Sequence, residues 1–81
     1  MAHVKILNEV TNGVPGDWRL CFQWCEYIYD DGSTENGYRF IWRRPDGSLQ
    51  AARGQARIPS LKDINELTYL AAKDGWLGSV E

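Results

Sequence analysis

The 81 residues of the chain, 43% of them hydrophobic, suffice for one small domain over 1–81 and are too few for two. The net charge of −2 does not favour a polyanionic partner, and no apolar run approaches the ~18 residues that a membrane span needs. No charged and then apolar leader follows Met1, so we expect a cytoplasmic protein that has no membrane partner.

The first part of the chain has the pattern of strands separated by turns. Residues 3–10 alternate imperfectly, as an edge strand does, and residues 18–29 form the strongest strand pattern, rich in aromatic side chains and free of Gly and Pro. Residues 38–43 follow a long acidic loop. The sequence Arg44-Pro45-Asp46-Gly47 is typical of a β-turn and predicts a return strand over residues 48–56.

A helix is predicted over residues 61–74. Ser60 is a favourable N-cap, and Asp63 lies three residues later, as in a capping box. Gly75 can adopt the left-handed conformation that ends a helix, and Trp76 then stands where a hydrophobic residue packs back on the last turn. Apolar residues repeat at helical spacing along one face, which comprises Leu61, Ile64, Leu67, Thr68 and Ala71.

These elements predict an α+β fold, an antiparallel meander of three to four strands followed by one C-terminal helix packed on one face. A register that pairs Trp24 with Trp42 gathers the large aromatic side chains on the face under the helix, with Ala52 and Gly54 opposite Phe40. The other face is then expected to be open, although a slip of one residue would exchange the faces. The predicted core contains Trp24, Phe40, Trp42, Ile64 and Leu67.

Charge is unevenly distributed along the chain. Residues 37–62 carry a net charge of +5, whereas both flanking segments are acidic. Arginine side chains bind phosphates and stack on bases or aromatic rings, so the basic Arg/aromatic hairpin at 37–57 suggests a binding module that contacts nucleic acid or an anionic protein. The candidate binding residues are Arg39, Arg43, Arg44, Arg53 and Arg57, with Tyr27 and Tyr29 on the same predicted face.

Other interpretations stay open from the sequence. The arginines can pair with Glu26, Asp30 or Asp46 and keep an open sheet face soluble. Alternatively, the chain is a protein–protein interaction module or a homodimer that uses the uncovered face or an edge strand. An enzyme is the least favoured class, because the sequence contains no serine-centred, phosphate-loop or dinucleotide motif.

The two cysteines predict free thiols. Cys21 and Cys25 are four residues apart in a predicted strand, which places their Cα atoms ~13 Å apart, beyond the reach of a disulfide. With His3 they match no zinc spacing, and the acidic loop at 30–35 is too short for a calcium loop. We therefore expect no metal and no cofactor.

Overall fold

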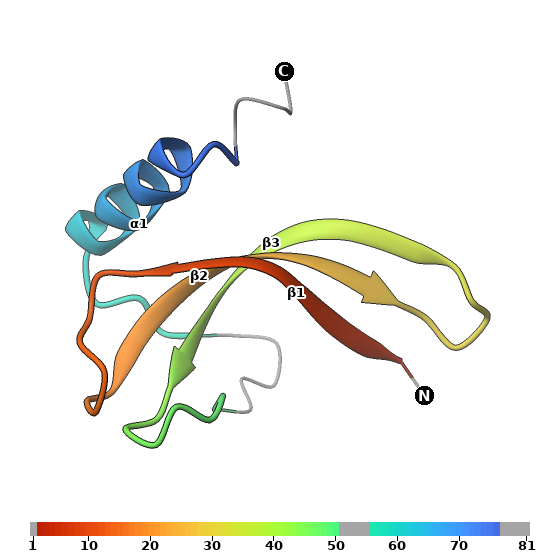
Figure 1. The fold of residues 1–81 in the computed structure, drawn as a ribbon, viewed down its shortest axis with the longest axis horizontal. Helices are drawn as coiled ribbons and strands as arrows, with labels where there is room; N and C mark the ends of the chain where they lie inside the picture. Colours follow the sequence, from red (N-terminus) through yellow and green to blue (C-terminus); the bar gives the residue numbers. More distant parts are fainter. Residues whose placement is uncertain (1, 51–55, 77–81) are drawn as a thin grey trace.

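The computed structural model describes residues 2–50 and 56–76. In these residues the elements follow in the order β1 (His3–Thr11), β2 (Arg19–Ile28), β3 (Thr34–Arg43) and α1 (Leu61–Lys73) (Figure 1). The strands form one antiparallel sheet in the order β1-β2-β3, as a meander requires. The chain is thus a small α+β structure with an antiparallel sheet, and no helix in the described residues is long and apolar enough to cross a membrane.

β1 contains an irregularity that interrupts its alternation. Ile6 pairs with Cys25 and Asn8 pairs with Trp24, so Leu7 is an extra residue between two paired positions. Such a bulge bends the strand and shifts which residues face each side of the sheet. Leu7 itself is exposed.

The register between β2 and β3 differs from the predicted one. Trp24 pairs with Tyr38, and Trp42 pairs with Leu20, so the expected pairing of Trp24 with Trp42 is wrong by four residues. The physical reason is a shorter turn: the Tyr29 N–H donates to Ser33 O at 2.9 Å, and β3 begins at Thr34. Because the shift is an even number of residues, the predicted division of β2 and β3 into two faces is unchanged.

The chain reverses again directly after β3. The Arg44 N–H donates to Ser48 O at 2.8 Å, and Gly47 has a φ of +90° in this turn. A fourth strand was predicted over 48–56, but in its described part only Leu49 forms a bridge, with Arg43, and Gln50 N–H donates to Trp42 O at 2.9 Å. The predicted positions of Ala52 and Gly54 lie outside the described residues.

The ends of α1 follow the sequence signals. Ser60 Oγ accepts a hydrogen bond from Asp63 N–H at 3.3 Å, which is the predicted N-cap. At the other end, Gly75 has a φ of +89°, its N–H donates to Ala72 O, and the Trp76 N–H donates to Ala71 O at 3.1 Å. This pair of bonds is the Schellman arrangement, and it directs the Trp76 side chain back toward the sheet.

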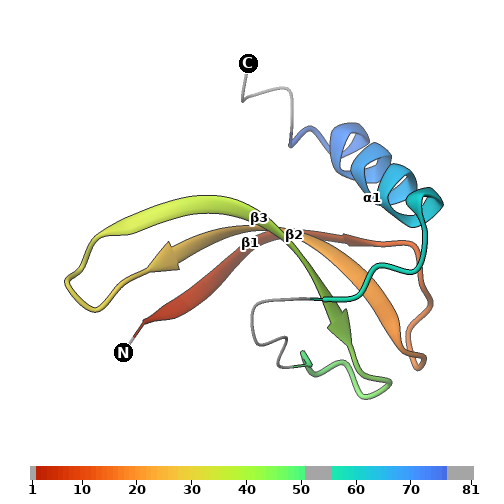
Figure 2. The same ribbon diagram turned by 180° about the vertical axis from the view of Figure 1, so that it is seen from behind.

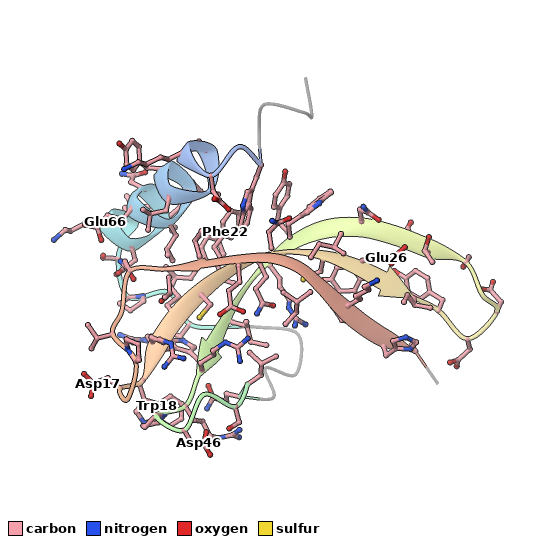
Figure 3. The ribbon with its side chains drawn as sticks, viewed as in Figure 1. Asp17, Trp18, Phe22, Glu26, Asp46 and Glu66 are labelled. Atoms are coloured by element: carbon pink, nitrogen blue, oxygen red, sulfur yellow. The ribbon has the colours of Figure 1, made fainter. Side chains whose placement is uncertain are left out.

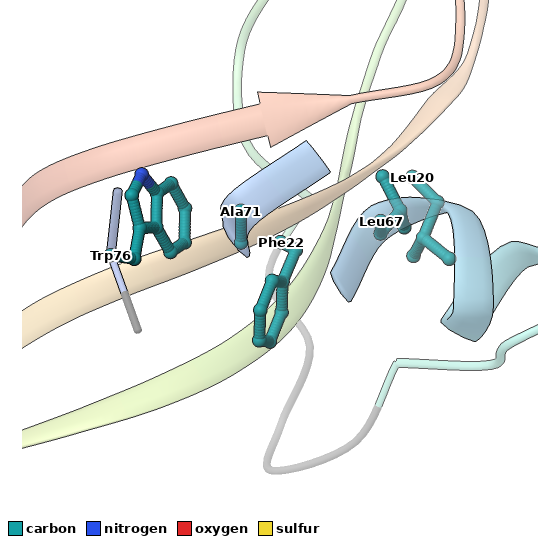
Figure 4. Packing of buried hydrophobic residues seen from close by; sticks show 5 residues of the cluster. All are labelled: Leu20, Phe22, Leu67, Ala71 and Trp76. Atoms are coloured by element: carbon teal, nitrogen blue, oxygen red, sulfur yellow. The ribbon is translucent and has the colours of Figure 1, made fainter. Parts of the chain in front are cut away.

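The hydrophobic core joins β2 to α1 and to the residues that follow the helix. Phe22 stacks on Trp76 with ring centroids 5.6 Å apart (Figure 4). The buried cluster consists of Leu20, Phe22, Leu67, Ala71 and Trp76, and half-buried Val10, Trp24, Phe40, Trp42, Ile58 and Leu70 pack against it. Leu61, which the helical pattern placed on the buried face, is 77% exposed, because it stands in the first turn at the outer end of α1.

We call the sheet face that bears Leu20, Phe22 and Trp24 the cluster face, and the face that bears Cys21, Gln23 and Cys25 the thiol face. Figures 1 and 2 show an arched sheet with α1 near the end at which β1 finishes, while the turn between β2 and β3 extends away from the helix. The 13 residues of α1 span ~20 Å and the ten residues of β2 span ~33 Å, so the helix is shorter than the strands it accompanies.

Candidate functional site

The thiol face carries a polar network across all three strands. In the register, Glu9 of β1 pairs with Gln23 of β2, and Gln23 pairs with Arg39 of β3. Gln23 donates from Nε2 to Glu9 Oε1 at 2.8 Å and accepts at Oε1 from Arg39 Nε at 2.7 Å. Gln23 is fully buried, and both the nitrogen and the oxygen of its side-chain amide have a hydrogen-bond partner. Buried polar groups in folded proteins are nearly always paired in this way.

Glu9 and Arg43 form the ion pair of this network. Arg43 donates from Nε to Glu9 Oε2 at 2.7 Å and from Nη2 to Glu9 Oε1 at 2.6 Å, and its Nη1 donates to Gly47 O. The hydrogen bonds from Arg43 lower the pKa of Glu9 from 4.5 to about 2, and the same contact raises the pKa of Arg43. Glu9 therefore stays ionised at neutral pH, and most of the Arg43 guanidinium is engaged inside the molecule.

The other candidate arginines are dispersed. Arg39 donates from Nε to Gln23, and Arg44 donates from Nη1 to Leu49 O at 2.8 Å. Arg57 is exposed, and its carbonyl accepts a hydrogen bond from Trp42 Nε1 at 2.8 Å. Arg53 lies outside the described residues. The structure thus brings Arg39 and Arg43 together on the thiol face, where both have partners.

The candidate tyrosines lie toward the turn between β2 and β3. Tyr27 is half-buried and packs over Gly37, where a Cβ would lie 3.5 Å from the Tyr27 ring. Tyr29 is exposed, and its hydroxyl donates to Glu35 at 2.8 Å. This acceptor raises the pKa of Tyr29 and occupies the only proton that its hydroxyl can donate.

The thiol face was expected to be open, and at its centre it is buried. Cys21, Gln23 and Cys25 have no exposed surface, and Ile41 is 6% exposed. Long side chains of Glu9 and the arginines lie over this part of the face, as the hydrogen bonds across Gln23 show. Both thiols are free, and burial raises the pKa of Cys21 to about 11 and raises that of Cys25. A thiol held in this way is a poor nucleophile.

On the cluster face, the sheet continues beyond the buried cluster. Figure 3 shows Phe22 beside α1 and Glu26 farther along β2, away from the helix. Between them Trp24 and Tyr38 are cross-strand partners with ring centroids 4.6 Å apart, and Tyr38 is 37% exposed. We call this region the aromatic half-face and define it by Lys5, Trp24, Glu26, Ile28 and Tyr38.

Sequence reasoning placed Trp24 in the core and did not single out Tyr38. The signal that could have identified these two residues as partly exposed is the difference in length between the helix and the strands, since one short helix cannot cover a ten-residue strand.

Among residues 2–50 and 56–76, no group of three His, Cys, Asp or Glu side chains could hold a metal. Comparisons with protein-family models, with curated proteins and with solved structures found no match to the chain.

Proposed function

We propose that this chain is a non-enzymatic protein-interaction module that associates with a second copy of itself through the aromatic half-face. The observation that carries the proposal is the pair formed by Trp24 and Tyr38, two large rings in contact at the margin of the buried cluster, where Tyr38 also stacks on Phe22 and is still 37% exposed. A few residues supply most of the binding free energy in a protein interface, and these residues are enriched in Trp and Tyr.

The polar ends of the two rings support the same interpretation. The Trp24 indole N–H and the Tyr38 hydroxyl have no hydrogen-bond partner among the described residues, although neither residue is fully exposed. Tyr and Trp are enriched in interfaces because a partner can cover the ring and also satisfy the polar group. Backbone carbonyls on the surface of a partner protein can accept hydrogen bonds from the Trp24 indole N–H and the Tyr38 hydroxyl.

The charges of the aromatic half-face favour a second copy as the occupant. Lys5 and Glu26 are cross-strand partners, so the half-face carries one positive and one negative side chain and is close to neutral. In a two-fold arrangement of two such faces, Lys5 of one copy can meet Glu26 of the other. An interface that is self-complementary in this way is what a symmetric dimer requires.

The proposal includes the arrangement expected from the sequence, in which α1 packs on one sheet face only. Its support is the composition of the buried cluster, which draws on Leu20 and Phe22 from β2 and on Leu67 and Ala71 from α1. With α1 at one end of this face, the other end is free to receive a partner (Figure 1).

A nucleic-acid partner is the competing class, and the arginine contacts favour it less. Arg43 is neutralised by Glu9, and Arg39 and Arg44 each donate to acceptors within the chain. The exposed Arg57 is the best remaining probe, because its side chain can change without disturbing the Glu9 network. A protein that neutralises phosphates loses affinity steeply as salt rises.

Sedimentation across a wide protein concentration range tests the proposal, and a titration with mixed DNA and RNA oligonucleotides tests the competing class. We expect a reversible dimer, and no binding of nucleic acid at low salt. A monomer at every concentration would contradict self-association. Salt-sensitive nucleic-acid binding that weakens in Arg57→Gln would assign the function to the basic residues instead.

A further inference from the structure

A groove lies between the outer edge of β1 and the last turns of α1, separate from the aromatic half-face. Its volume is about 490 Å³, within the range of ligand-binding clefts. One wall consists of Glu9, Val10 and Thr11 near the end of β1, and the other of Leu70, Lys73 and Asp74. The groove therefore runs beside a strand and is lined by both apolar and charged side chains.

The strand wall of the groove is an unpaired sheet edge. β1 is the first strand in the order β1-β2-β3, so its outer side has no neighbouring strand in the described residues. Alternate residues of such a strand direct their backbone N–H and C=O groups away from the sheet. The bulge at Leu7 interrupts the edge before the groove, and the stretch from Asn8 to Thr11 continues in regular pairing with β2.

The two walls are held at a fixed separation. At one end, Asn12 Nδ2 donates to Glu66 Oε1 at 2.7 Å and to Asp63 Oδ1 at 3.1 Å, which ties the residue after β1 to the first turns of α1. At the other end, Trp76 is buried against Phe22 and fixes the last turn of the helix. The groove is thus formed before any ligand binds, and a ligand need not order it.

Among the charged groups of the lining, Lys73 alone lacks a partner within the described residues. Glu9 is bound to Arg43, and Asp74 Oδ2 accepts from the Trp76 indole N–H at 2.8 Å. Lys73 is exposed at the mouth of the groove. A ligand that carries a carboxylate near this position gains an ion pair there.

We propose that the groove binds an extended peptide segment of a partner protein, which adds to β1 as a fourth strand and places a carboxylate against Lys73. The backbone of the segment pairs with the outer edge of β1 over Asn8–Thr11. Its side chains on one side cover Val10 and Leu70. This mode of binding takes its affinity from main-chain hydrogen bonds and its selectivity from the side-chain contacts beside them.

The test begins with a random-peptide display selection against the full chain, followed by backbone amide shift mapping with synthetic versions of the selected peptides. We expect shifts at residues 8–11 and 70–74. N-methylation at every second peptide position should abolish binding, and methylation at the intervening positions should leave it intact, because only alternate amides face β1. Failure to select any peptide, shifts elsewhere, or indifference to N-methylation would overturn the proposal.

Two lysine variants test whether Lys73 binds a carboxylate of the peptide. Lys73→Gln should weaken an acidic peptide about two- to fivefold, as expected for an exposed ion pair, and should not change binding of the same peptide with its acid groups amidated. Lys62→Gln, a matched change in the first turn of α1, should alter neither affinity. If Lys73→Gln lost the same affinity for the acidic peptide and for the amidated peptide, Lys73 would act only by supporting the helix. Because the groove does not include Tyr38, the result is independent of whether the chain dimerises.

Discussion

The carboxylate of Glu9 on β1 and the guanidinium of Arg43 on β3 meet across the strand that lies between them, through hydrogen bonds of 2.6 and 2.7 Å. The two residues are 34 positions apart in the sequence and belong to the two outer strands of the sheet. Their contact ties both outer strands together above buried Gln23. It also explains why a residue that appeared available for phosphate binding is occupied inside the fold.

Replacing Glu9 by Gln should lower the free energy of unfolding by about 1–3 kcal/mol, because charge-assisted hydrogen bonds to Arg43 are lost while the shape is kept. Urea unfolding at pH 7 measures the change. Asp17→Asn is the control, since Asp17 is an exposed carboxylate in the turn before β2 and lies outside the aromatic half-face, and it should cost far less. Equal losses in both variants would show that the network does not stabilise the fold.

Acid unfolding should report the same carboxylate. The pKa of Glu9 in the folded chain is about 2, below its ordinary value of 4.5. Because the folded pKa is the lower one, the stabilisation is fully present above the ordinary value and is lost as the pH falls toward about 2. The difference in stability between the native chain and Glu9→Gln should therefore shrink over this interval. A difference in stability that stays constant with pH would contradict the lowered pKa of Glu9.

The thiols should be unreactive in the folded chain. Burial raises the pKa of Cys21 to about 11, so almost no thiolate exists near neutral pH, and Cys25 is also fully buried. A disulfide reagent at pH 7.5–8 should modify neither thiol in native buffer and both in denaturant. Rapid modification of one thiol in native buffer would show that the thiol face opens.

Trp76 should be the most important tryptophan for stability. It is 7% exposed and stacks on Phe22, so Trp76→Ala should cost about 3–5 kcal/mol and leave so small a domain largely unfolded at room temperature. Trp18 is 52% exposed, and Trp18→Ala should change the free energy of unfolding by no more than about 0.5 kcal/mol. Thermal melts of both variants provide the measurement, and similar melting temperatures would contradict the core described above.

Local chemistry made the helix predictable. Ser60, Gly75 and Trp76 each act within a few residues of their own position, and the structure has the predicted cap, left-handed residue and back-packing side chain. Strand alternation likewise divided β2 and β3 correctly into two faces, because the side-chain period of a strand is fixed.

Long-range geometry was not predictable in the same way. The register of Trp24 depended on where the turn falls, and two different turn lengths were compatible with the same alternation. The partner of Arg43 is Glu9, an acidic residue on a strand that does not neighbour β3, whereas the sequence alone favours acidic residues nearer to the arginine, such as Asp46. The bulge at Leu7, which places Glu9 on the thiol face, has no signature in the sequence.

The central claim is that the aromatic half-face binds a second copy of the chain, and sedimentation of a small set of variants tests it most directly. Tyr38→Ser should shift the chain toward monomer, whereas Tyr69→Ser, which changes a tyrosine that is 64% exposed on α1, should not. Glu26→Lys should weaken the dimer and addition of Lys5→Glu should restore it, which separates binding from any loss of stability in the Tyr38 variant. A wild-type chain that stays monomeric, or a dimer indifferent to both Tyr38→Ser and Glu26→Lys, would contradict the account.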